Sequence, residues 1–241
     1  MKSFNVKKSF MLKLFLILIL TTPIFAQEFS VGTDFVSRYI WRGSDLGENT
    51  PSIQPNLSFG ISGLTVGFWG AWPTANPAGL DEIDIYASYA IDLKTAGGLS
   101  LGVTDYTNPN SGTKIGNFNN YDNKNGAGAH FLEANVNYSA PESFPIYLSF
   151  NIFFYNLKNN PIYVEAGYST TVKDIGFSAF AGLTPGEDQA YYGVTNFSVI
   201  NLGIKASKEI KVTDSFSIPL FGSVILNPAS ENLFYVLGVS L

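Results

Sequence analysis

The chain has 241 residues, of which 46% are hydrophobic and only 14% are charged, and its formal net charge is −5. This acidic balance argues against nucleic-acid binding, because a protein of that class needs a basic face to neutralise phosphates. The chain has no cysteine, so disulfides cannot stabilise it, and its stability must come from packing and sheet pairing.

Residues 1–26 have the pattern of a secretory signal peptide. Four lysines form a basic start, residues 14–20 are an unbroken apolar run, and residues 21–26 lead to an expected cleavage before Gln27. A membrane-spanning helix would need about 20 apolar residues, and only about a dozen are available here. We therefore expect export of a mature chain, residues 27–241, with 10 basic and 19 acidic residues.

The first expected strand covers residues 29–41 and alternates between apolar and polar side chains. Its apolar face ends in Tyr39 and Trp41, which would lie in an aromatic belt at the membrane interface. Its other face carries Asp34 and Arg38. This alternation predicts a strand with lipid on one side and a polar lumen on the other.

Eleven further segments follow, and most are close to the roughly 9 to 11 residues that a tilted membrane strand requires. The expected segments are 53–61, 64–72, 82–91, 99–107, 131–138, 146–157, 162–171, 175–184, 197–207, 216–226 and 233–241. The Ser-Gly pair at 62–63 gives the strongest hairpin signal. Twelve strands are predicted; ten or fourteen stay open, because residues 191–207 are difficult to divide.

Long and short connections alternate along the chain. With the N-terminus on the periplasmic side, residues 43–50 and 108–129 would form outer loops, and the longer one would either enter the lumen or extend into solvent. The last segment ends on the apolar Leu241 and would pair with the first strand, leaving no edge in lipid. A soluble β-sandwich is the alternative, but its exterior should carry more charge. The predicted fold is therefore all-β: a transmembrane, outer-membrane antiparallel β-barrel of about 12 strands.

Little in the sequence indicates catalysis, a metal or a cofactor. The single histidine, His130, would lie at the outer rim, and no Gly-x-Ser-x-Gly motif accompanies it. The segment 121–126 has some features of a calcium loop, but Tyr121 and Leu132 stand where its first and twelfth ligands should be. We expect no catalytic residue, no metal site and no cofactor.

Charged residues at inward positions form the candidate site. In a narrow barrel such charges must be paired or hydrated. Two interpretations stay open: a polar constriction that sorts solutes by charge, or a salt-bridged plug that keeps the barrel rigid. The candidate pore-lining residues are Asp34, Arg38, Arg42, Asp84, Glu133, Glu165 and Lys205. Aromatic residues with inward parity, which would stack a ligand or pack the lumen, are Phe153, Tyr155, Phe180 and Phe221.

The pattern Tyr39-x-x-Arg42-Gly43, followed by Pro51-x-x-Gln54, resembles that of a family of exported bacterial proteins, formerly of unknown function and labelled TorF-type porins. The resemblance continues through residues 67–70, 81–86, 106–109, 131–133 and 163–168. It implies an outer-membrane β-barrel and, from the label, a channel. It implies no particular substrate.

We therefore predict a monomeric porin of the Gram-negative outer membrane, through which small hydrophilic solutes diffuse passively. Its expected partners are outer-membrane lipids, these solutes and the barrel-assembly machinery. That machinery would recognise the C-terminal strand, although Leu241 stands where many barrels have Phe. The alternative is a non-conducting barrel with a structural or ligand-binding role. A hydrolase that uses His130 is a third, less favoured hypothesis.

Overall fold

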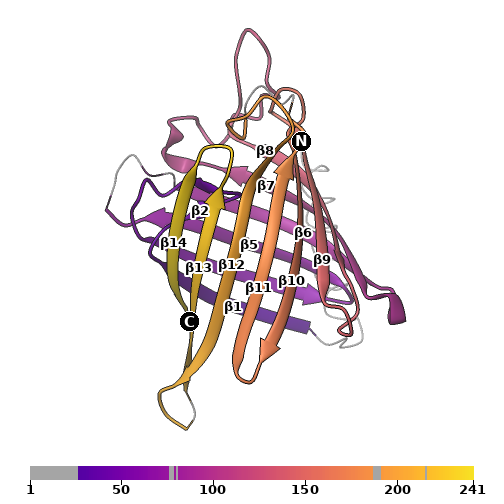
Figure 1. Ribbon diagram of the computed structural model, residues 1–241. Coiled ribbons are helices and arrows are strands. Elements are labelled where there is room, and N and C mark those ends of the chain that lie inside the picture. The colour runs from indigo at the N-terminus through magenta and orange to yellow at the C-terminus, as the bar shows by residue number, and fades with distance from the viewer. Residues whose placement is uncertain (1–26, 76–78, 80, 187–190, 215) are drawn as a thin grey trace, which may run out of the picture.

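The computed structural model describes residues 27–75, 79, 81–186, 191–214 and 216–241, which form one closed antiparallel barrel of twelve strands (Figure 1). The predicted signal peptide lies outside the described residues. The all-β barrel of twelve strands, rather than ten or fourteen, is confirmed. The barrel strands are β1 (Gln27–Val36), β4 (Ser52–Ile61), β5 (Leu64–Pro73), β6 (Glu82–Asp92), β7 (Gly98–Thr107), β8 (Phe131–Ser139), β9 (Ile146–Tyr155), β10 (Ile162–Val172), β11 (Ile175–Thr184), β12 (Ser198–Lys211), β13 (Ser217–Asn227) and β14 (Asn232–Ser240).

The last strand closes the barrel against the first, as predicted. Thr33 and Leu241 exchange two backbone hydrogen bonds of 3.0 and 2.9 Å, and Phe35 pairs with Val239. Beside this seam, a cluster of buried apolar side chains lines the inner wall: Val36, Ile225, Phe234 and Val236. A closed sheet leaves no unpaired edge, which is the condition for strands to lie in lipid.

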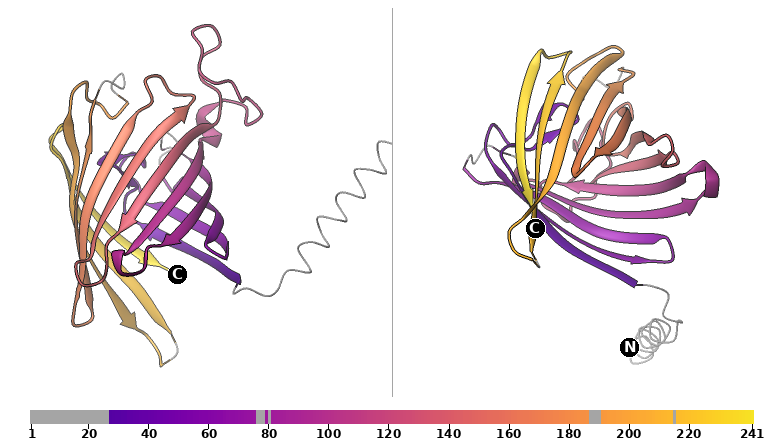
Figure 2. Two further views of the ribbon diagram at one scale, coloured as in Figure 1. Left: turned by 90° about the vertical axis from the view of Figure 1, so that its right-hand side faces the viewer. Right: turned by 60° about the horizontal axis from the view of Figure 1, so that its bottom comes forward.

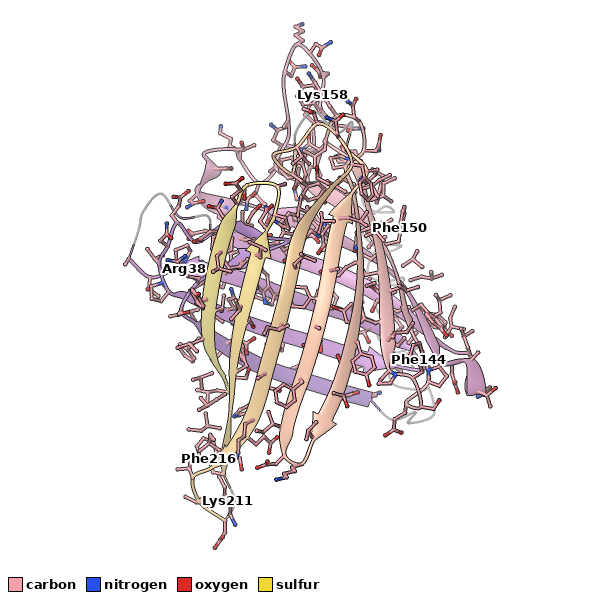
Figure 3. The ribbon with its side chains drawn as sticks, viewed as in Figure 1. Arg38, Phe144, Phe150, Lys158, Lys211 and Phe216 are labelled. Atoms are coloured by element: carbon pink, nitrogen blue, oxygen red, sulfur yellow. The ribbon has the colours of Figure 1, made fainter. Side chains whose placement is uncertain are left out.

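The connections differ between the two ends of the barrel. β4 and β5 are joined by Ser62 and Gly63 alone, whereas the connection from β7 to β8 covers residues 108–130. This long loop stands beyond the end of the barrel in Figure 2. In Figure 3, Lys158 marks the same end and Lys211 the opposite one. Helical structure in the described part of the chain consists of two short 3₁₀ turns, and no helix there is long and apolar enough to span a membrane.

The two faces of the sheet differ in polarity. Outward side chains are apolar and exposed; Phe29 and Leu237 are both 69% exposed. Inward side chains include the buried amides of Gln54, Asn151 and Asn201. This is the alternation of a barrel whose outer surface is covered by lipid and whose inner surface is polar.

Inward aromatic rings lie over glycines on the neighbouring strand. Phe180 pairs directly with Gly203, and Phe221 with Gly238; an added Cβ on either glycine would lie 2.1 Å from the facing ring. Two tyrosines cover glycines in the same way, Tyr86 over Gly67 and Tyr147 over Gly167. An aromatic residue that covers a cross-strand glycine restores the packing that the glycine lacks. These rings therefore pack along the wall.

The first strand is shorter than predicted. β1 ends at Val36 and does not continue to residue 41. The aromatic belt expected from Tyr39 and Trp41 is therefore wrong: Tyr39 is buried, and the Trp41 ring lies 6.1 Å from that of Tyr106, inside the barrel. Both rings find aromatic and polar partners in the lumen, so this part of the chain turns inward.

Gly203→Ala should destabilise the barrel, because its Cβ would meet the Phe180 ring at 2.1 Å. Overpacking of this kind costs about 1–3 kcal/mol. The temperature at which the folded band disappears on a gel measures the loss. Gly116→Ala is the matched control, since nothing lies within 4 Å of a Cβ at that position. Equal stability of the two variants would contradict the packing role of the ring.

Candidate functional site

Residues 37–51, between β1 and β4, fold back into the barrel. There β2 (Ile40–Trp41) pairs with β3 (Ser44–Asp45), and we call residues 40–45 the inner hairpin. Arg42 and Gly43 form its tip, with φ angles of 48° and 78°. The left-handed conformation at both positions reverses the chain, and glycine adopts it without strain. The Asp45 carboxylate accepts hydrogen bonds from two backbone N–H groups further along the loop and fixes its return.

The loop reaches across the lumen from one wall to another. Gly43 has no room for a side chain, since a Cβ would lie 1.9 Å from the carbonyl oxygen of Ile200 on β12. Its own carbonyl accepts a 3.1 Å hydrogen bond from the Asn227 amide on β13. On the other side, the Tyr39 hydroxyl donates a 2.9 Å hydrogen bond to Glu82 on β6. The loop thus bridges β6 and the wall formed by β12 and β13.

Arg42 makes the central ion pair of the site. Its Nη1 and Nη2 atoms donate to the two carboxylate oxygens of Glu133 on β8, at 2.6 and 2.8 Å. Glu133 is 0% exposed and also accepts hydrogen bonds from the Tyr106 hydroxyl and the Asn135 amide, at 2.9 and 2.8 Å. Bidentate pairing and these added donors satisfy a carboxylate that water does not reach.

Aromatic rings enclose the guanidinium group of Arg42. Its central carbon lies 4.4 Å from the centroid of Trp41 and 4.5 Å from that of Tyr163 on β10. Its Nη1 also donates to the Tyr192 hydroxyl at 2.7 Å. Cation–π attraction strengthens when the cation is shielded from water, as it is here. The rings and Glu133 together hold the tip of the inner hairpin at one position.

A second pair of carboxylates, Glu82 and Asp84, projects inward from β6, and both residues are more than nine-tenths buried. Burial, and then the negative charges of Glu82 and Asp84, raise the pKa of Tyr39 well above 10, so its phenol remains a donor. The Oδ1 atom of Asp84 has no hydrogen-bond partner among the described residues. Glu82 was not among the predicted site residues, although it shares the inward parity of Asp84.

Glu165 on β10 belongs to a third group of polar side chains. It accepts hydrogen bonds from the Tyr147 hydroxyl at 2.7 Å, from the Tyr163 hydroxyl, and from the Asn201 amide at 3.1 Å. Because the Tyr163 ring also lies beside Arg42, Glu165 is one side chain away from the central ion pair.

Above the ion pair, a cavity of about 360 Å³ opens between the inner hairpin and the outer loops; we call it the vestibule. Its wall includes Trp41, Glu82, Tyr106, Tyr191 and Tyr192. Beneath it, Phe153 is 1% exposed, and its ring contacts those of Tyr106 and Tyr191. Phe153 is therefore packed and does not present a free ring to a solute.

The structure brings part of the predicted set together. Arg42 and Glu133 are in contact, Asp84 lies close by on β6, and Glu165 joins through Tyr163. The others lie apart. Arg38 is 3.9 Å from Asp45 within the loop, Lys205 lies over the Phe221 ring at 4.0 Å, and Asp34 is beside the closing seam, opposite Ser240. A pore-lining role for these residues stays a prediction.

His130 anchors the long outer loop. Its Nδ1 lies 2.7 Å from the Asp105 carboxylate, its Nε2 lies 2.8 Å from the Ile115 carbonyl oxygen, and the Phe118 ring stacks on it at 4.1 Å. Both ring nitrogens face acceptors, so the ring donates to both only when it is protonated. Where a serine hydrolase would hold a hydroxyl, Nε2 thus meets a backbone carbonyl.

The family model described as "Bacterial protein of unknown function (Gcw_chp)" matches residues 21–217. The chain belongs to this family. No curated protein matches it significantly in sequence. The TorF name suggested by the motifs is not supported by these findings.

Two solved structures share the fold of this family member. A structure titled "KdgM porin" has a TM-score of 0.52 and 12% identity, over 87% of this chain and 97% of that one. A second, "KdgM porin in complex with disordered oligogalacturonate", has a TM-score of 0.53 and 11% identity over the same shares. At this identity the likeness concerns the fold alone.

Glu133→Ala should cost about 3–5 kcal/mol of unfolding free energy, because it leaves the Arg42 charge buried without a counter-charge. The double variant Arg42→Ala/Glu133→Ala removes both charges and should lose less than the single variant. Denaturant unfolding of the barrel in detergent micelles measures both. A double variant that is as unstable as Glu133→Ala, or less stable, would argue against the pair as the anchor of the inner hairpin.

The anchoring of the outer loop should weaken as pH rises. Burial disfavours the charged ring, but the hydrogen bonds to Asp105 and Ile115 outweigh it and raise the pKa of His130 above 6.5. A group with a raised pKa stabilises the folded loop below its ordinary pKa and ceases to do so as pH rises through the raised value. Hydrogen exchange of residues 108–129 between pH about 6 and about 9 should show this loss. His130→Gln should give a flat profile; the same slope in that variant would refute the assignment.

Proposed function

We propose that this chain is a monomeric outer-membrane porin through which small hydrophilic solutes diffuse passively. The outer face of the barrel is apolar and exposed, and its inner face is polar, as a sheet with lipid outside and water inside requires. The observation that carries the proposal is the inner hairpin, which enters the lumen and holds an ion pair there without adding a strand to the wall.

The size of the barrel supports a narrow path. Barrels of about eight strands are filled by their own side chains, whereas those of about 16 strands hold a wide aqueous channel. Twelve strands lie between these limits, and the inner hairpin takes up part of the remaining width. The fold is shared with a protein titled a porin, which supports the same reading.

The envelope location is also part of the proposal. The exposed outward side chains, such as Phe29 and Leu237, would be covered by outer-membrane lipid. The expected signal peptide at residues 1–26 would direct export, and the C-terminal strand β14 would be recognised by the barrel-assembly machinery. The proposal includes no catalytic role.

The ligand of the second similar structure is not carried over. Oligogalacturonate is a chain of acidic sugars, and its recognition calls for cations that are free to meet carboxylates. In this chain both terminal nitrogens of Arg42 already bind Glu133. Neutral sugars are therefore the appropriate first probes of diffusion.

Liposomes that contain the folded mature chain should swell in small neutral sugars, and the rate should fall as sugar size increases. The variant Arg42→Ala/Glu133→Ala frees the tip of the inner hairpin, so it should admit larger sugars than the wild-type chain. The initial swelling rate, measured by light scattering over a series from pentose to trisaccharide, gives the size limit of each protein.

The matched control is Lys94→Ala/Asp92→Ala, which removes an exposed ion pair in the turn between β6 and β7. Its size limit should equal that of the wild type. A heat-resistant, folded wild-type barrel that produces no swelling would overturn the porin proposal and favour the non-conducting barrel. An unchanged size limit in the Arg42/Glu133 variant would overturn the role of the inner hairpin.

A further inference from the structure

Negative charge exceeds positive charge around the inner hairpin. The central cation, Arg42, is 9% exposed, and its terminal nitrogens are used by Glu133 and Tyr192. Lys205 lies elsewhere, over Phe221. The inward carboxylates that form no ion pair within the described part of the chain are Glu82, Asp84 and Glu165.

Of these carboxylates, the pair on β6 is the least satisfied by the protein. Glu165 has three hydrogen-bond donors, whereas Glu82 accepts the Tyr39 hydroxyl. Asp84 is only 7% exposed, and its Oδ1 has no partner among the described residues. A buried carboxylate oxygen without a partner is costly, so it points to a positively charged or donating ligand that comes from outside the protein.

The vestibule gives such a ligand access to this pair. Glu82 forms part of its wall, and no lysine, arginine or histidine is among the described residues that line it. The faces of Trp41, Tyr106, Tyr191 and Tyr192 surround the same space. Aromatic faces attract cations, so both the charge and the rings of the vestibule favour a positive solute.

We propose that Glu82 and Asp84 form a cation subsite that sets the selectivity of the barrel. This inference rests on the proposed porin function and specifies its solutes: cations and neutral molecules pass, and anions of the same size are rejected. Carboxylates that line a narrow pore concentrate cations and repel anions. No group of three metal-ligating side chains occurs in the described residues, which is consistent with a monovalent or ammonium-type cation.

The test is the reversal potential of the barrel in a planar bilayer under a KCl gradient. The wild-type chain should favour K⁺ over Cl⁻ by about tenfold. Glu82→Gln/Asp84→Asn keeps the shape of both side chains and should lower this ratio several-fold. The matched control is Glu142→Gln/Glu231→Gln, which removes two negative charges from exposed turns outside the lumen and should keep the wild-type ratio.

The outcomes separate the two proposals. Absence of channel currents from the folded wild-type barrel would overturn the porin function itself. Currents without a preference for K⁺, or a preference that Glu82→Gln/Asp84→Asn leaves unchanged, would overturn the cation subsite alone. Should that variant fail to fold, swelling of wild-type liposomes decides: a neutral hexose should enter faster than the uronate of the same ring size, and equal rates would refute the inference.

Discussion

The ion pair between Arg42 and Glu133 joins two parts of the molecule that strand pairing would leave apart. Residues 37–51 belong to no barrel strand, and their tip is fixed by side chains from β8, β10, β12 and β13. A buried ion pair contributes little net stability, yet removing one partner is very costly. The pair therefore acts by fixing position: it sets where the inner hairpin lies, and hence where the lumen is narrowest.

The wall and the constriction use aromatic residues in different ways. Along the wall, rings such as Phe180 lie over glycines of the next strand and take little space from the lumen. At the inner hairpin, rings such as Trp41 and Tyr192 gather around one guanidinium group. The charged side chains that meet there lie at one level, and carboxylates outnumber cations. Narrowing and charge selection thus depend on the same few residues.

Much of the fold could be predicted from alternation, because a strand between lipid and a polar lumen must alternate. The apolar end at Leu241 correctly indicated closure against the first strand. The end of β1 could not be found in this way, since the parity of residues 37–41 is the same in a strand and in a hairpin. Parity also assigned Arg42 and Glu133 to the lumen, but it gives a face and not a depth, so it could not separate them from Asp34 or Lys205. Tyr192 lies in a loop without periodicity, where the sequence carried no signal.

The central claim is an open water path through the barrel, narrowed by the inner hairpin. Single-channel conductance in the presence of neutral polymers of increasing size tests it most directly. The account predicts steady currents that small polymers reduce, and a sharp size above which polymers no longer enter and the current recovers. A folded barrel that inserts into the bilayer but carries no current would contradict it.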